Sequence, residues 1–306
     1  MLITLGTPLN ATPKPWLYFK VQALLINALE VKRDPRAVLQ YEGELWLDSG
    51  GYQILKKGIS IDVHDIIKIY EGVDAQLYFS LDVPPTPQDP PEVAKKKFEK
   101  TYRNWLKMSK RLEVVPILHV YKEATHFFKY LERYLDAPLL AIGGAVPYVL
   151  TTRGAPKNSR HYALSLIAEV RQLYGGRLHV LGLGSPAVTP ILKAVGVDST
   201  DTATWRLKAA YGKVLLPGGG ERHVTKRDVK FGKAKPKDGE LEELHHFLRE
   251  TGFPLSDGFS ERLASFEYRA LVNAWVVQKS ELPPRSPIFK KLYEAITSPA
   301  LHTSSL

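Results

Sequence analysis

The chain has 306 residues, of which 44% are hydrophobic, so a large buried core is possible and wholesale disorder is excluded. The absence of cysteine excludes disulfides, thiolate metal sites and a cysteine nucleophile, and no apolar run is long enough to span a membrane. A total of 42 Lys and Arg against 32 Asp and Glu gives a net charge of +10, which indicates a polyanionic partner such as nucleic acid. The N-terminus lacks the basic and apolar regions of a signal peptide, so we expect a cytoplasmic protein.

Taken in chain order, short apolar runs alternate with segments of helical periodicity. The apolar runs are residues 2–6, 44–48, 75–82, 114–121, 137–145, 177–184 and 197–201, with 213–217 as an eighth candidate. Runs this apolar are typical of parallel strands that are buried on both faces. Their number favours an α/β fold of the (β/α)8 TIM-barrel type. No GxGxxG motif opens a helix after a strand, so a dinucleotide-binding fold gains no support.

The composition changes after Pro217. Residues 218–237 are rich in glycine and basic side chains and poor in apolar ones, and three helical patterns follow at 240–250, 260–280 and 286–296. The middle pattern is apolar on all sides, which predicts a helix packed against the barrel. We therefore expect residues 1–217 to form the barrel core with the active site. Residues 218–306 then form a basic insertion followed by C-terminal helices.

Three predicted strands end in aspartate, at Asp48, Asp82 and Asp201. Two others end in glycines, which are Gly143 with Gly144 and Gly182 with Gly184. A lone Asp at such a place is usually a helix N-cap. In a barrel, however, the C-terminal ends of all strands meet on one face. The sequence therefore predicts one cleft that combines three carboxylates with exposed backbone.

These residue types together suit base exchange on a nucleoside. One carboxylate can attack an anomeric carbon while a second manages protons. A third can accept two hydrogen bonds from the N–H edge of guanine. Glycines let a flat base lie against the backbone, and a tyrosine ring can stack on it.

The ordered motifs "LDSGGYQ", "SLDVPP", "LAIGGA", "HVLGLGSP" and "GVDSTD" resemble those of the tRNA-guanine transglycosylase superfamily over residues 40–217. The superfamily includes queuine- and archaeosine-type tRNA-ribosyltransferases and a branch that inserts 7-deazaguanines into DNA. The resemblance implies a (β/α)8 barrel that exchanges guanine in a nucleic acid for a free 7-deazaguanine base, with no cofactor. It assigns the nucleophile to Asp201, proton handling to Asp48 and the guanine edge to Asp82. The residues that it places around the base are Tyr52, Gln53, Gly143, Gly144, Gly182 and Gly184.

Several features depart from the family pattern. The family's cysteine-rich zinc site has no counterpart, and the adjacent His245 and His246 make a poor zinc set, so we expect no metal. His119 stands near the family's Gln-Gly-Gly turn and is either a base contact or simply a strand residue. The run after Asp201 is closer to archaeal members and to the DNA branch. Homodimers are usual in the family, so a homodimer is possible here.

Basic residues near and beyond the last predicted strand are candidates for phosphate contact. They are Arg206, Arg222, Lys226, Arg227, Lys230 and Lys233. The loss of the zinc module favours DNA over tRNA as the polymer, and tRNA stays as the alternative. A non-catalytic nucleic-acid-binding partner subunit is a further alternative, which the three retained aspartates disfavour. An unrelated barrel glycosidase is disfavoured because none of the strand ends carries a Glu.

Overall fold

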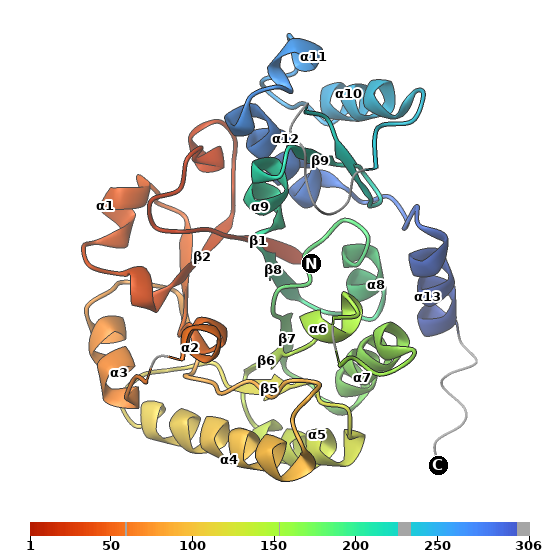
Figure 1. Ribbon diagram of the computed structural model, residues 1–306. Coiled ribbons are helices and arrows are strands. Elements are labelled where there is room, and N and C mark those ends of the chain that lie inside the picture. Colours follow the sequence, from red (N-terminus) through yellow and green to blue (C-terminus); the bar gives the residue numbers. More distant parts are fainter. Residues whose placement is uncertain (59, 153, 226–233, 299–306) are drawn as a thin grey trace.

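Eight parallel strands form a single sheet in the computed structural model, which describes residues 1–58, 60–152, 154–225 and 234–298 (Figure 1). The strand order is β4-β3-β2-β1-β8-β7-β6-β5, so strands that are neighbours in the sheet are consecutive in the chain, except that β1 pairs with β8. The strands are β1 (Leu2–Gly6), β2 (Ala23–Asn27), β3 (Glu44–Asp48), β4 (Leu77–Tyr78), β5 (Ile117–His119), β6 (Leu139–Gly143), β7 (Arg177–Val180) and β8 (Ser199–Thr202).

The two outer strands of this sheet meet through one parallel bridge between Phe79 and Val115. The Val115 N–H donates to the Tyr78 carbonyl at 2.8 Å, and the Ser80 N–H donates to the Val115 carbonyl at 2.9 Å. This bridge joins β4 to β5 and curls the sheet into a ring. The predicted (β/α)8 barrel is therefore confirmed.

One barrel strand was missing from the sequence prediction, and one predicted strand lies elsewhere. Strand β2 (Ala23–Asn27) is buried at every residue and pairs with β1 and β3. It escaped prediction because a 3-10 turn, η2 (Ala28–Glu30), and the five-residue helix α1 (Pro35–Leu39) follow it instead of a long amphipathic helix. Within the expected strand 213–217, β9 (Lys213–Leu215) pairs antiparallel with β10 (Glu221–His223), outside the barrel sheet.

Helices cover the outside of the ring (Figure 1), and side chains fill its inside. The interior cluster takes residues from successive strands, including Leu25, Trp46, Phe79, Ile117 and Ala141. Alternation along each strand sends the next residues outward against the helices. The covering helices are α2 (Gly51–Lys57), α3 (Val63–Glu71), α4 (Pro91–Met108), α5 (Ala124–Leu131), α6 (Val146–Val149), α7 (Ser159–Leu173), α8 (Thr189–Ala194) and α9 (Thr204–Ala210).

The C-terminal helices pack on the barrel at two places. Helix α12 (Phe266–Lys279) contacts α9, β9 and β1, and ten of its residues are buried, which explains why its sequence has no polar face. Helix α13 (Pro287–Thr297) contacts α7 and α8. The two remaining helices are α10 (Glu240–Glu250) and α11 (Phe259–Arg262). None of the helices that the structure describes has the length and apolarity needed to cross a membrane.

A buried amide joins α12 to the end of the barrel. The Asn273 side chain accepts from the Leu215 N–H at 2.7 Å and donates to the carbonyls of Trp205 and Lys213 at 3.1 Å each. It is fully buried, so no water can replace these partners without rearrangement.

We predict that Asn273→Leu, which keeps the side-chain volume, lowers the free energy of unfolding by about 3 kcal/mol, because three buried backbone groups lose their partner. Urea denaturation measures the change. Gln278→Leu, a partly buried position on the same helix, serves as the matched control and is expected to change stability by about 0.5 kcal/mol or less. Equal effects of the two variants would contradict a role for Asn273 as the link.

Candidate active site

Five of the predicted site residues lie at or just beyond the C-terminal ends of barrel strands. Asp48 ends β3, His119 ends β5 and Gly143 ends β6, whereas Asp82 follows β4 and Asp201 lies within β8. Because the strands are parallel, these positions share one face of the barrel.

Asp201 is held through one of its two carboxylate oxygens. The Gly182 N–H donates to Oδ1 at 2.8 Å, and Nε2 of His179 lies 3.3 Å from the same atom. The Gly184 N–H donates to the Asp201 main-chain carbonyl at 2.9 Å. Gly182 has a φ of +76°, a conformation that side chains disfavour, and this turn aims its N–H at the carboxylate. Within the described residues, both hydrogen bonds to the carboxylate go to Oδ1, so Oδ2 is left for other chemistry.

His179 is a site residue that the sequence analysis missed. It is fully buried on β7, and its imidazole ring contacts the rings of Trp46 and Phe79 inside the barrel. Its Nδ1 lies 2.9 Å from the Ser199 hydroxyl. The available signal was a histidine inside an otherwise apolar strand. His179 reaches Asp201 only because β7 pairs with β8, and this pairing cannot be read from the local sequence.

Asp82 and His119 form a close pair. Nε2 of His119 lies 2.7 Å from Oδ2 of Asp82, and the Ser49 hydroxyl donates to Oδ1 at 3.4 Å. His119 is fully buried, and its Nδ1 has no hydrogen-bond partner in the described structure. The structure therefore brings His119 to the candidate site through Asp82. Whether it also replaces the family's base-contacting Gln stays a prediction.

The glycines of "DSGG" are explained by what packs against them. A Cβ on Gly51 would lie 1.9 Å from Oδ1 of Asp82, and one on Gly50 would lie 2.7 Å from Oδ1 of Asn27. A side chain at either position would displace a polar residue of the neighbouring strand end. At the end of β6, a Cβ on Gly143 would lie 3.0 Å from the His119 ring, and one on Gly144 would lie 3.1 Å from the Val120 carbonyl.

Asp48 is the carboxylate with the strongest electrostatic perturbation. Burial, followed by the negative charges of Asp82 and Asp201, raises the pKa of Asp48 to about 7, although the N–H groups of Gly50 and Ser49 act in the opposite direction. The Gly50 N–H lies 3.2 Å from Oδ2 of Asp48. The three aspartates therefore lie close enough to interact, and Asp48 can gain or lose a proton near neutral pH.

A cavity of about 300 Å³ opens beside Asp48. Gln53 also lines it, as predicted for a pocket residue, together with Asn27 and Glu30, which the sequence analysis did not single out. This volume is at the lower end of small-molecule sites. The signal for Asn27 and Glu30 was absent because β2 itself was not predicted.

Five predicted contacts are not among the described residues and side chains. The side chain of Tyr52 and the residues Lys226, Arg227, Lys230 and Lys233 lie outside the described parts of the chain, so these assignments stay predictions.

The remaining two predicted phosphate contacts are engaged within the protein. Arg206, on α9, lies over the Phe266 ring at 5.4 Å and donates to the Thr12 carbonyl at 3.4 Å. Arg222 makes two hydrogen bonds of 2.5 Å each to the Glu240 carboxylate. This pairing favours a structural role for Arg222, in which it fastens β10 to α10, over the expected phosphate contact.

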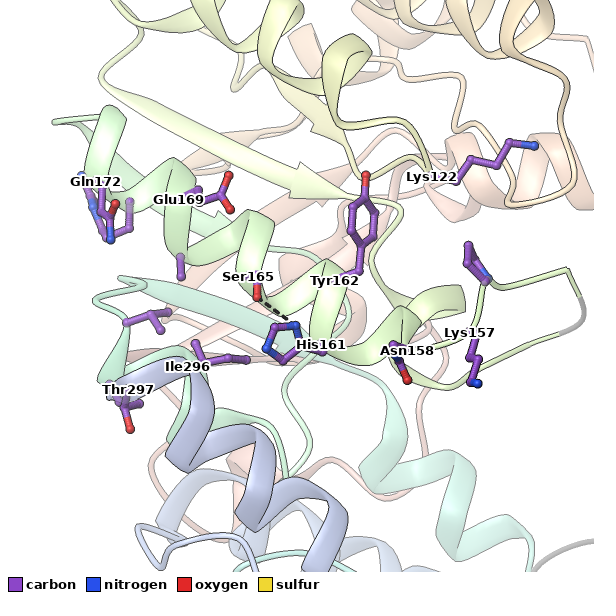
Figure 2. Close-up of a pocket in the computed structure, with 15 residues that line it drawn as sticks. Lys122, Lys157, Asn158, His161, Tyr162, Ser165, Glu169, Gln172, Ile296 and Thr297 are labelled. Carbon is purple, nitrogen blue, oxygen red and sulfur yellow. Dashed lines mark hydrogen bonds between the residues drawn. The ribbon is translucent and has the colours of Figure 1, made fainter. Parts of the chain in front are cut away.

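A larger depression, of about 740 Å³, lies against α7 and the end of α13 (Figure 2). Side chains of α7, including His161, Tyr162 and Glu169, line it together with the end of α13. None of the predicted base-binding or catalytic residues is among its lining residues. In the described ranges, no three His, Asp or Glu side chains gather so that they could hold a metal ion.

We predict that the raised pKa of Asp48 makes the protein less stable as pH rises. Below pH 3.8 the carboxyl is protonated in both the folded and the unfolded state, so it costs nothing. Between 3.8 and about 7 the unfolded state ionises first, and stability falls until the folded carboxyl ionises too. The loss is up to about 4 kcal/mol, at about 1.4 kcal/mol per pKa unit, and solvent screening reduces it.

Urea unfolding of wild type and Asp48→Asn at pH 4, 5.5, 7 and 8 tests this prediction. The stability of the variant relative to wild type should rise across that range. The exposed Asp136 supplies the control, since Asp136→Asn should not change the pH dependence. A constant difference between wild type and Asp48→Asn would show that Asp48 ionises normally.

The chain has relatives among known proteins, although no protein-family model matches it. "Uncharacterized protein 306" of Sulfolobus islandicus rod-shaped virus 1 is 29% identical over 83% of this chain and 75% of that protein. The tRNA-guanine(15) transglycosylases of Korarchaeum cryptofilum and Pyrobaculum aerophilum are 24% and 29% identical over 68% and 70% of this chain. This chain spans 38% and 43% of the length of those two enzymes. These matches and the closed barrel confirm the resemblance to the tRNA-guanine transglycosylase superfamily that the motifs indicate.

Proposed function

We propose that this chain is a guanine transglycosylase that exchanges guanine in a polynucleotide for a free 7-deazaguanine base. The observation that carries the proposal is the Asp201 carboxylate, which is hydrogen-bonded through one oxygen only within the described residues and lies beside Asp48, whose pKa is about 7. One oxygen of Asp201 is held by backbone and imidazole donors, which orients the other for attack. A nucleophile and a proton carrier on one barrel face are what base exchange requires.

In the first half-reaction, Oδ2 of Asp201 attacks C1′ of the target nucleotide. The C1′–N9 bond breaks, and its electron pair leaves with the guanine. The protonated Asp48 carboxyl gives its proton to the departing base, which is released neutral. An acid with a pKa near 7 suits this step at physiological pH, because an ordinary aspartic acid would hold almost no proton there.

In the second half-reaction, the Asp48 carboxylate takes the proton from the ring nitrogen of the incoming base. That nitrogen then attacks C1′, and the ester bond to Asp201 breaks with its electron pair returning to the carboxylate. Both aspartates end in their starting states, so the cycle needs no cofactor. The His179 and Gly182 contacts stabilise the Asp201 carboxylate each time it re-forms.

Recognition of guanine falls to Asp82 in this proposal. Its Oδ2 is committed to His119, whereas Oδ1 has one long contact of 3.4 Å with Ser49. Oδ1 is therefore the atom offered to the N1–H and amine edge of guanine. His119 acts here as the group that orients Asp82, and the cavity between Asp48 and Gln53 gives the base room to enter.

We place tRNA ahead of DNA as the polymer. The relatives whose names state an activity are tRNA-guanine(15) transglycosylases, whereas the preference for DNA from sequence rested on the missing zinc module. DNA remains the second arm of the experiment. The identity of the incoming 7-deazaguanine is tested by competition between the 7-cyano and aminomethyl forms.

We predict that Asp201→Asn lowers the exchange of radiolabelled guanine into a tRNA transcript by about 10⁴-fold or more, because the amide cannot form the ester to C1′. Asp198→Asn is the matched control from the same motif. Asp198 precedes β8, at the opposite end of that strand, where its Oδ2 accepts from the Leu178 N–H at 2.7 Å. It should keep exchange within about tenfold of wild type, since the change touches only this contact and the ion pair between Asp198 and Arg171 at 3.4 Å, both of which are structural.

The same assay with single-stranded DNA separates the two polymers. Label in tRNA alone supports the tRNA enzyme, and label in DNA alone moves the proposal to the DNA branch. Label in neither polymer, from folded wild-type protein, would reject the catalytic proposal in favour of a binding subunit. Near-normal exchange by Asp201→Asn would assign the nucleophile to another residue.

A further inference from the structure

Helix α4 carries four basic side chains in a row along one face. Lys96, Lys100, Arg103 and Lys107 follow one another at intervals of four, three and four residues, and all four are exposed. At 100° per residue these intervals keep the side chains within about 60° of one another, and the row is about 16 Å long. We call these four residues the α4 stripe.

The positive charge of the three lysines in the stripe is not neutralised by the protein. Nearby carboxylates are committed to other cations: Glu99 binds Arg103 at 3.1 Å and Arg133 at 3.3 Å, and Asp89 binds Lys97 at 2.7 Å. Throughout the described structure, the three lysines form no ion pair with a carboxylate, including Glu92 one turn earlier on the same helix. The three lysines of the stripe therefore form a line of uncompensated positive charge, whereas Arg103 between them is paired with Glu99.

Another side of the same helix is attached to the candidate site. The Val83 N–H donates to the Thr101 hydroxyl at 2.9 Å, and the Asn104 amide donates to the Leu81 carbonyl at 3.0 Å. Thr101 and Asn104 are both buried, and together they hold the backbone on either side of Asp82. Whatever binds the stripe is thus rigidly positioned relative to the residue assigned to guanine.

The helix is also fixed to the barrel, so the stripe is preorganised. The Phe98 ring stacks on Tyr130 of α5 at 5.1 Å, and the Trp105 indole donates to the Val114 carbonyl at 3.2 Å. Helix α4 runs beside α5 along the lower edge of the view in Figure 1, on the outside of the ring. Binding of a ligand to the stripe therefore loses little conformational entropy in the helix, which is already ordered.

We propose that the α4 stripe binds the phosphate backbone of the polynucleotide whose guanine enters the site. The inference rests on the proposed function for the presence of a polynucleotide, and it adds the surface along which the strand runs. Lysine-rich rows are the common means of contacting phosphates, whereas protein–protein interfaces are depleted in lysine. The intervals along the row, about 6 and 4.5 Å, let successive side chains reach successive phosphates.

The test compares two triple variants with the same change of charge. The stripe variant is Lys96→Ala, Lys100→Ala and Lys107→Ala. The control is Lys20→Ala, Lys290→Ala and Lys291→Ala, which removes three exposed lysines from other parts of the surface. Binding of a tRNA transcript and of a single-stranded DNA is measured between 50 and 200 mM salt, and circular dichroism checks that both variants are folded.

Each lost phosphate contact lowers the slope of log affinity against log salt by about 0.7 to 0.9. We expect the stripe variant to lose about 2 to 3 in slope and the control to lose less than 1. A loss with tRNA alone identifies RNA as the source of the phosphates, and a loss with DNA alone identifies DNA. Equal slopes for the two variants on both polymers would overturn the proposal and leave the stripe as a solvated surface.

Failure of this inference can be told apart from failure of the proposed function. At saturating polymer, the stripe variant should exchange guanine at the wild-type rate, because no stripe residue contacts the reacting atoms. A steep, stripe-dependent slope without any exchange by the wild type would reject the transglycosylase and retain the binding surface. Exchange by the wild type, with no difference in slope between the two variants, would retain the transglycosylase and reject the α4 stripe as a binding surface.

Discussion

A single backbone bridge, between Phe79 and Val115, closes the barrel, and the geometry of the site depends on it. The bridge joins the two strands that lead to Asp82 and His119, and it brings Nε2 of His119 to 2.7 Å from the Asp82 carboxylate. Two backbone hydrogen bonds contribute about 1 kcal/mol each, which is little for a junction on which the ring depends. Further support comes from Tyr70, whose buried hydroxyl donates to the Phe79 carbonyl at 2.7 Å.

Closure has an electrostatic consequence. Asp48 and Asp82 follow neighbouring strands, and the ring brings Asp201 of β8 to the same face, where the charges of Asp82 and Asp201 raise the cost of ionising Asp48. Burial and these two charges together raise the pKa of Asp48 to about 7. Asp201 and Asp82 each have a histidine within hydrogen-bonding distance. The fold thus separates the three carboxylates into one with a raised pKa and two that are each held by a histidine.

Helix α4 links this site to the charge of the whole molecule. Its buried polar residues hold the Asp82 loop, and its exposed lysines contribute to a net charge of +10. The basic segment 218–237, which the sequence singled out as a nucleic-acid contact, contains Arg222, which is already paired with Glu240. Charge density along a sequence therefore identifies basic residues, but the placement of acids decides which of them remain free for a ligand.

The sequence by itself determined the alternation of strands and helices and the positions of Asp48, Asp82 and Asp201 at strand ends. These features are local, because an apolar run of a given length and the residue that ends it can be read without knowing any partner. Strand β2 was not predictable in the same way, since no amphipathic helix follows it, and residues 213–217 carry the same apolar signal as a barrel strand although they pair elsewhere. Only the tertiary structure decided that His179 holds Asp201, that His119 holds Asp82, and that Arg222 is neutralised by Glu240. Each of these contacts joins residues 18 to 37 positions apart, and their meeting depends on strand order and on closure of the ring, which no local pattern encodes.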